Sequence, residues 1–406
     1  MSRVMLGYRP IFERLLDDVA FLWLQRSQVV DHPAYFQWDL AAMDERMQNY
    51  FRALLQAPDI SWALFEESVD VADAGYFFAS AVLAFRTLNT KNIQKLVEWS
   101  TGNREGIAGI SSALAYLPGS LVHPWIKKFL ISQNKHHQYL ALSACHLRRE
   151  DPRSYLTKIL QQPDIKSHKD LFITALKLAG TLKRADMLPL LHSAMADKCI
   201  EVKFWAAWSC ALLKDTTAIP VLKKFAKADN HWQKDALTSL LLLLDTAEAR
   251  ALVDGLSRNE ATRRQAIEGC TVLSDASALP WLLQMAKLEE FNQKATQAVV
   301  TITGITLEND WLKPHPTQSE ESDFADLDEE LPRVDPNKLM SAWQQNSARW
   351  KSGQRYFLGE PLETRKILNL YQHANQAHRR TAALHLATLL PDRPLLDHAR
   401  AEIFQL

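Results

Sequence analysis

Three successive stretches decide the fold: VKFWAAWSCALLKDTTAIPVLKKF (residues 202–225), QKDALTSLLLLLDTAEARALVDG (residues 233–255) and RRQAIEGCTVLSDASALPWLLQM (residues 263–285). When the stretches are aligned, one aspartate of each falls in register, 30 residues from the next: Asp215, Asp245 and Asp275. Nine positions before each aspartate stands an alanine: Ala206, Ala236 and Ala266. A repeat of this period indicates an array of stacked units.

Each unit reads as two helices joined by a tight turn. The first helix carries apolar residues at helical spacing around the small alanine, which lets a neighbouring backbone come close. In the second helix we expect Thr217 and Ser277 to be N-caps. Pro220 and Pro280 then fall in the first turn, where no intrahelical N–H is lost. Neither helix buries its apolar stripe alone, and stacking gains roughly 1.5–3 kcal/mol per buried Leu or Phe.

The same template extends outward along the chain. Pro189 lies 31 residues before Pro220, with Asp186 as its expected cap, and Pro124 takes the same place in an earlier unit. Near the C-terminus, residues 377–390 read as one more first helix, with Ala382 in the core position.

The pattern resembles HEAT-type repeats, and two pairs of arginines are typical of the HEAT-like variety: Arg263-Arg264 and Arg379-Arg380. The sequence therefore predicts an all-α, HEAT-like α-solenoid of stacked helix pairs.

Composition divides the chain into four parts. Residues 1–74 lie outside the repeat and hold twelve acidic residues against six arginines and no lysine, so we expect a helical N-terminal cap, or alternatively a docking surface for a partner. Residues 75–306 form the predicted repeat array. Residues 307–334 are acidic, contain prolines and lack an apolar period, which predicts a linker or loop. Residues 335–406 form the predicted C-terminal helical segment.

Bulk properties exclude several classes of protein. Glycine is 12 of 406 residues, which disfavours a turn-rich β fold, and the formal net charge is zero, so no global charge favours nucleic acid or membrane. The longest apolar run, residues 240–244, is far too short for a bilayer, and the N-terminus lacks the pattern of a signal peptide. We expect a cytoplasmic protein with no membrane contact. The sequence does not predict an oligomeric state.

The motif search predicts no catalytic residue, no metal ligand set and no cofactor. No glycine-rich phosphate loop, dinucleotide fingerprint or G-x-S-x-G turn is present. The four cysteines show no C-x-x-C spacing, and we interpret them as small core residues. We interpret the histidine clusters, at residues 136–146 and 373–385, as exposed or core-edge side chains, because neither supplies a metal-binding helix motif.

A basic strip is the most suggestive feature. In a HEAT-type superhelix the second helices line the concave side, and the strip is predicted from the positions that follow the proline of each second helix: Lys127, Lys128, His192, Lys223, Lys224 and Lys227. One hypothesis is a groove for an acidic partner, and the other is the solvated face of each helix. Phe204, Trp205 and Trp208 are interpreted as packing between repeat units, with an aromatic binding patch as the alternative.

Two end segments carry a further resemblance: FLWLQRSQVV…YFQWDLAAMDERMQNYFRALLQA near the N-terminus and DPNKLMSAWQQNSARWKSGQRYFLGEPL near the C-terminus. They resemble an uncharacterised proteobacterial family with HEAT-like repeats, whose genes often lie among type VI secretion genes. The resemblance implies a non-catalytic protein-binding solenoid, an immunity protein or adaptor for a secretion effector. The alternatives are a nucleic-acid binder that contacts the phosphate backbone through the basic groove, and an enzyme of the kind of the HEAT-like bilin lyases.

Overall fold

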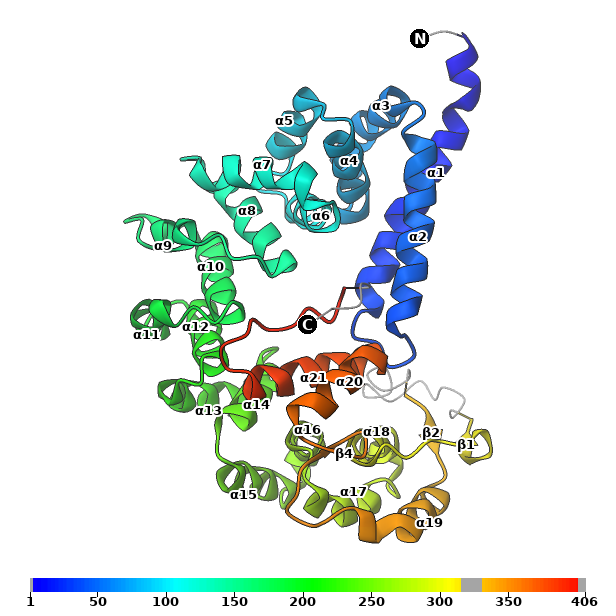
Figure 1. The fold of residues 1–406 in the computed structure, drawn as a ribbon, viewed down its shortest axis with the longest axis vertical. Helices are drawn as coiled ribbons and strands as arrows, with labels where there is room; N and C mark the ends of the chain where they lie inside the picture. The colour runs from blue at the N-terminus through cyan, green and yellow to red at the C-terminus, as the bar shows by residue number, and fades with distance from the viewer. Residues whose placement is uncertain (1–2, 315–330, 401–406) are drawn as a thin grey trace. The chain divides into compact units, whose positions relative to one another are not determined.

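The computed structural model describes residues 3–314 and 331–400, and nearly all regular structure in them is helical (Figure 1). The prediction of an all-α solenoid of stacked helix pairs is confirmed. Contacts divide the chain into two compact units, Met1–Pro189 with Asp397–Leu406, and Leu190–Leu396. This division falls inside the predicted array of residues 75–306.

The first unit begins with three helices outside the repeat, and α1 packs against α2 and α4. Gly75, in α4, lies so close to the backbone of α1 that a Cβ atom there would stand 2.5 Å from the Ala20 carbonyl oxygen. The helices of this unit are α1 (Arg3–Val29), α2 (Gln37–Leu54), α3 (Pro58–Ser68), α4 (Ala74–Arg86), α5 (Thr90–Trp99), α6 (Arg104–Tyr116), α7 (Gly119–Ile131), α8 (Lys135–Arg148), α9 (Ser154–Leu160) and α10 (Lys169–Thr181).

The second unit continues the helix pairs and ends with two short strand pairs and three helices. Its helices are α11 (Leu188–Met195, which begins at the boundary), α12 (Ile200–Leu212), α13 (Ile219–Lys227), α14 (Gln233–Leu243), α15 (Thr246–Ser257), α16 (Arg263–Leu273), α17 (Leu279–Met285), α18 (Asn292–Thr303), α19 (Pro336–Asn346), α20 (Thr364–His373) and α21 (Gln376–Leu389). Its strands are β1 (Leu312–Lys313), β2 (Arg333–Val334), β3 (Tyr356–Phe357) and β4 (Glu360–Pro361), paired as β1–β2 and β3–β4.

A continuous hydrophobic seam runs through the first helices of successive pairs. Ala206, Ala236 and Ala266 are each 0% exposed. They lie in α12, α14 and α16, which pack in that order, and α16 packs in turn on α18. The prediction that a small residue marks the helix–helix contact is therefore confirmed. Larger apolar side chains around it, such as Phe204 and Leu240, fill the space between helices.

The turn between the helices of a pair differs in detail from the prediction. Asp215 and Asp275 are the caps, and the backbone N–H groups of Thr217 and Ser277 donate to them. Each aspartate caps a short 3₁₀ turn. The α-helices α13 and α17 begin after this turn, one residue before their prolines. The expected capping role of Thr217 and Ser277 is therefore wrong.

The cap predicted for α11 is also wrong. The carboxylate of Asp186 accepts from the Arg184 guanidinium, at 2.8 Å from Nε and 2.7 Å from Nη2, and the 3₁₀ turn that precedes α11 has no side-chain cap. In this helix pair the Asp186 carboxylate therefore pairs with the Arg184 side chain instead of accepting a backbone N–H.

A left-handed residue follows the first helices α8, α12 and α16, directly before the acidic residue that comes next in the chain. The φ angles are 55° at Arg149, 61° at Lys214 and 56° at Ser274. A residue in this conformation ends the helix and turns the chain, so that the following backbone N–H groups can bond the last carbonyl groups of the helix. The turn thus recurs although the residue in it varies, which explains why the sequence alignment shows the acid and not its neighbour.

The C-terminal segment binds back onto the repeats. Residues 356–359 donate backbone hydrogen bonds to the ends of α16 and α18, with Tyr356 N 2.7 Å from Ser274 O and Leu358 N 2.6 Å from Thr301 O. These bonds satisfy carbonyl groups that a helix leaves free at its C-terminus. Gly359 (φ 80°) and Gly304 (φ 68°) allow this approach, because a Cβ atom on Gly304 would lie 2.5 Å from Leu358 O.

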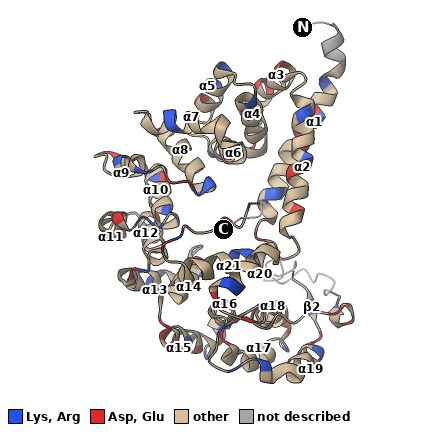
Figure 2. Cartoon of the chain, in the orientation of Figure 1, with Lys and Arg blue, Asp and Glu red and all other residues tan. Residues whose placement is uncertain are grey.

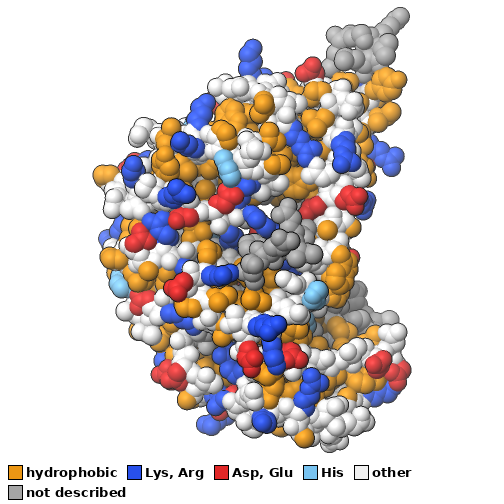
Figure 3. All heavy atoms as spheres, viewed as in Figure 1, with side chains coloured by type: hydrophobic (Ala, Val, Ile, Leu, Met, Phe, Trp, Pro, Cys, Tyr) orange, Lys and Arg blue, Asp and Glu red, His pale blue; other side chains and the backbone are white. Residues whose placement is uncertain are grey.

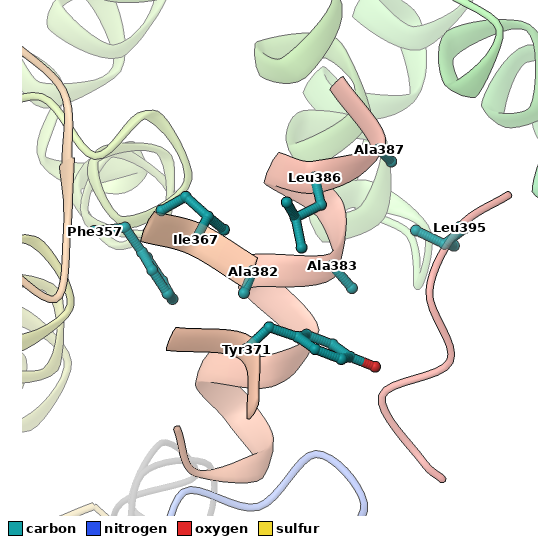
Figure 4. Close-up of a cluster of buried hydrophobic side chains, with 8 residues drawn as sticks. All are labelled: Phe357, Ile367, Tyr371, Ala382, Ala383, Leu386, Ala387 and Leu395. Atoms are coloured by element: carbon teal, nitrogen blue, oxygen red, sulfur yellow. The ribbon is translucent and has the colours of Figure 1, made fainter. Parts of the chain in front are cut away.

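The last two helices, α20 and α21, form their own hydrophobic cluster (Figure 4). In the close-up, side chains of both helices converge, and Phe357 of β3 and Leu395 of the following segment close the cluster. His378 and His385 are also buried in α21, at 6% and 1% exposure, so the expectation of exposed or core-edge histidines is wrong for these two.

The predicted acidic linker, residues 307–334, lies partly outside the described residues. Its two flanks pair as antiparallel strands, with Leu312 opposite Val334 and Lys313 opposite Arg333. The Asn292 side chain of α18 bonds both backbone groups of Val334 at 3.0 Å. Leu312 and Val334 therefore occupy neighbouring positions in the second unit.

Candidate functional site

A basic side chain on a second helix contacts an acid at the end of the next first helix in three places. His123 Nε2 of α7 lies 2.9 Å from Glu150 Oε2, which follows α8. His192 of α11 contacts Asp215 in the same way, and Arg250 of α15 contacts Asp275. These pairs link consecutive repeats, so part of the charge on the second helices stabilises the array itself.

The lysines of α13 are not used in this way. Lys223, Lys224 and Lys227 are exposed, while Leu222, Phe225 and Ala226 on the opposite side of the helix are buried. Among the described residues, no acidic side chain pairs with any of the three lysines. Figure 2 shows the charged residues along the helices of both units. The α13 lysines therefore form a small, unneutralised basic surface, called here the α13 lysine cluster.

The two predicted lysines of the first unit are also on the outside of their helix. Lys127 and Lys128 of α7 are exposed, and Val122, Ile126 and Phe129 are buried on its other side. The Lys128 ammonium lies 4.9 Å from the centre of the Trp125 ring, a distance at which a cation and an aromatic face attract. Lys127 has no ion pair among the residues that the structure describes.

His192 is placed differently from the lysines of the predicted strip. Its imidazole contacts the Asp215 carboxylate, and the Cys210 thiol lies nearby. Burial raises the pKa of the Asp215 carboxyl, whereas the hydrogen bonds from His192 and Thr217 lower it. The net result is a pKa below the ordinary value. His192 thus belongs to the contact between two repeats, although its side chain remains 44% exposed.

A pocket of about 330 Å³ lies between α15, α16 and α17. The ion pair of Arg250 and buried Asp275 lines it, together with Asp254 of α15 and Arg258, which directly follows α15. The other lining residues are Val253, Ser257, Cys270, Leu273, Ser277, Ala278 and Trp281. The mixture of both charges and an indole ring fits a polar side chain or small polar molecule better than an apolar one.

The buried cysteines have the environment of core residues. Burial raises the pKa of the Cys145, Cys210 and Cys270 thiols to about 12, so each thiol is protonated at neutral pH. The thiolate, not the thiol, is the reactive form of cysteine. The interpretation as small core residues is confirmed for these three, whereas Cys199 is only partly buried.

The predicted packing between repeats is confirmed for Phe204 of the aromatic cluster. Phe204 is fully buried, 5.2 Å from the ring centre of Phe225 and 5.4 Å from that of Trp232. Trp208 packs against the C-terminal hydrophobic cluster, and its ring centre lies 5.6 Å from that of Trp205. Phe204 and Trp208 therefore contribute to packing.

Comparison with known proteins agrees with this geometry. A family model described as HEAT repeats matches residues 154–241, which span α9 to α14. No curated protein and no solved structure matches the chain. No helix in the described part of the chain has both the length and the apolar character needed to cross a bilayer. The fold and the match together support HEAT-like repeats in this chain, and such repeats generally mediate protein interactions.

Proposed function

We propose that this chain is a non-catalytic protein-binding solenoid that engages an acidic surface of its partner through exposed lysines on its second helices. The α13 lysine cluster carries the proposal, because three exposed cations lie on one short helix with no acidic partner among the described residues. A rigid array supports such a surface without requiring pocket chemistry.

Each compact unit has its own exposed lysines. Lys127 and Lys128 lie in the first unit, and the α13 lysine cluster lies in the second. Each is held by a helix whose other side is packed in the core, so the side chains extend from a fixed backbone. Complementary charge of this kind speeds association and selects partners more than it adds affinity.

The partner we propose is a secretion effector that the chain neutralises or escorts. The support is the resemblance of the two end segments to the family found near type VI secretion genes. A protein partner agrees with the general role of HEAT repeats as interaction surfaces.

Binding of a nucleic-acid phosphate backbone is the second candidate. The same exposed lysines favour it, because lysine pairs readily with phosphate. However, Lys, Arg, Asp and Glu side chains are interspersed on the face drawn in Figure 3, and the formal net charge of the whole chain is zero. A protein partner with a local acidic patch fits this mixture better than a uniformly charged polymer.

The test is quantitative capture from the native cell with the tagged chain, after nuclease treatment. The variant Lys223→Glu/Lys224→Glu/Lys227→Glu is compared with wild type. We expect the specific acidic protein to be captured at least about tenfold less, which corresponds to about 1.4 kcal/mol. The midpoint of thermal unfolding should change by only a few degrees, because exposed lysines contribute little to stability.

A matched control, Lys91→Glu/Lys287→Glu/Lys351→Glu, reverses the charge of three exposed lysines elsewhere. It changes the net charge by the same amount as the first variant does. This control should capture the partner as wild type does. If both triple variants capture it equally, the α13 lysine cluster is not the binding surface. If nuclease alone abolishes capture, the nucleic-acid candidate replaces the protein one. If the captured protein is a toxin, co-expression with this chain should restore growth.

A further inference from the structure

Three metal-ligating side chains meet at the contact between α11 and α12. His192 is on α11, Cys210 is on α12, and Asp215 caps the turn that follows α12. One ligand atom from each, a ring nitrogen, the thiol sulfur and a carboxylate oxygen, lies within 4.8 Å of the other two. No other such group occurs among the described residues.

The three residues are held by the fold in different ways. Asp215 Oδ1 accepts from the Thr217 backbone N–H at 3.0 Å, which fixes the carboxylate and leaves Oδ2 for His192. The Asp215 N–H donates to the Cys210 carbonyl oxygen at 3.0 Å, so the cap and the cysteine are tied through the backbone. Cys210 is 0% exposed, whereas the His192 side chain is 44% exposed and gives the cluster an opening to solvent.

The same register in two other repeats provides an internal comparison. His123, Cys145 and Glu150 occupy the corresponding places, but the second oxygen of Glu150 accepts from Arg148 Nη2 at 2.9 Å. Arg250, Cys270 and Asp275 do so again, with a guanidinium in place of the imidazole. A guanidinium does not ligate metals and competes for the carboxylate. Only the α11–α12 cluster combines three ligands with no arginine on the acid in the described structure.

We propose that His192, Cys210 and Asp215 bind a zinc ion, with a fourth position open to water on the His192 side. Sulfur, imidazole nitrogen and carboxylate oxygen are the ligands that zinc takes, and three protein ligands with one open position are typical of an accessible site. The thiolate favours zinc over magnesium or calcium, which prefer oxygen.

The charge balance of the cluster fits a divalent cation. Binding forms a bond from zinc to sulfur, breaks the S–H bond, and releases that proton to solvent. The thiolate and the carboxylate then neutralise the two positive charges, and the imidazole stays neutral. Without a cation, burial and the nearby Asp215 hold the pKa of Cys210 at about 12. A bound metal removes this obstacle, because a coordinating thiol is deprotonated outright.

The test is titration of the metal-free protein with cobalt(II), which reports a thiolate ligand by a charge-transfer band in the near ultraviolet. We expect the band to saturate at one equivalent and to disappear when zinc is added. Zinc alone should raise the midpoint of thermal unfolding of the wild-type protein, because it binds the folded state. Absence of a thiolate band at stoichiometric cobalt would overturn the proposal.

Three variants assign the ligands. Cys210→Ala should lose the band, while Cys199→Ala should keep it, since Cys199 is the more accessible thiol and lies outside the cluster. His192→Gln changes an exposed side chain and leaves the core intact, so it tests the site even if Cys210→Ala does not fold. It should lose the zinc-induced rise in thermal midpoint. A rise that persists in His192→Gln, or a band lost in Cys199→Ala, would show that zinc binds elsewhere.

Discussion

At the scale of single residues, the buried histidines of α21 are the most sensitive points of the second unit. Burial lowers the pKa of His378 to about 4 and that of His385 to about 3. For His385 the nearby Arg355 also lowers the pKa, and neither ring nitrogen has a hydrogen-bond partner among the described residues. His378 Nε2 lies 3.0 Å from Thr301 Oγ1 and 3.1 Å from Gln297 Nε2. Both histidines are therefore neutral in the folded protein.

These two histidines should make the protein sensitive to mild acid. The unfolded chain binds a proton at each histidine below its ordinary pKa of 6.5, while the folded chain does not until about pH 4 or 3. Stability is thus full above pH 6.5 and falls as the pH is lowered, by about 2 kcal/mol per histidine at pH 5. Urea unfolding at pH 7.5 and pH 5.0 measures the difference. The variant His385→Leu should lose about 2 kcal/mol less than wild type, and an equal loss would contradict the role of His385.

At the scale of elements, the capping aspartates of successive turns differ in what they hold. Asp245 Oδ1 only accepts the Glu248 N–H of α15, at 2.8 Å, and the residue is exposed. Asp275 caps the turn before α17, contacts the Arg250 guanidinium, and is 1% exposed. Two aspartates at the same repeat position therefore contribute differently to stability.

We expect Asp245→Ala to cost about 1 kcal/mol, the usual value of an N-cap. Asp275→Ala should cost about 3 kcal/mol or more, because it also leaves Arg250 without its buried partner. Chemical denaturation of both variants measures the difference. Equal losses would mean that the Arg250–Asp275 pair adds nothing beyond the cap.

Gly109 of α6 tests the close contact between α4 and α6, and Gly255 of α15 serves as its control. A Cβ atom on Gly109 would lie 2.5 Å from the Ala74 carbonyl oxygen and 2.7 Å from the Phe78 nitrogen, both backbone atoms. Gly255 in α15 has no atom within 4 Å of the same position. Gly109→Ala should therefore destabilise the protein by about 3 kcal/mol, as overpacking does. Gly255→Ala should stabilise it by about 0.5–1 kcal/mol, because a helix favours alanine. Thermal unfolding distinguishes them, and a stable Gly109→Ala would contradict the close approach.

The sequence predicted elements wherever the signal is local. The 30-residue period, the core alanines and the proline after each turn depend on neighbours within one helix pair, so alignment of the chain with itself reveals them. The contacts it missed join distant residues. Residues 356–359 bond α16 and α18 across a long separation, and His192, Cys210 and Asp215 meet only when two repeats stack. No periodic pattern marks such contacts.

At the scale of the whole molecule, helix pairs stack and share hydrophobic packing, as in the seam through α12, α14, α16 and α18. In the second unit, α13 packs on α12 and α14 of the seam through buried Leu222, Phe225 and Ala226, so the α13 lysine cluster extends from a fixed backbone. The candidate binding residues were only partly predictable. The lysines follow from position in the repeat, whereas the contact that holds His192 depends on the acid of the next repeat.

The most direct test of the stacked arrangement replaces each of two alanines of the second unit by leucine and measures the free energy of unfolding. Ala236 is 0% exposed in the seam, and Ala251 is an exposed residue of the second helix in the same pair. We predict that Ala236→Leu lowers the free energy of unfolding by about 2 kcal/mol, because the neighbouring helices must move apart. Ala251→Leu should change it by less than about 0.5 kcal/mol. Equal effects, or a larger loss for Ala251→Leu, would contradict the stacked arrangement.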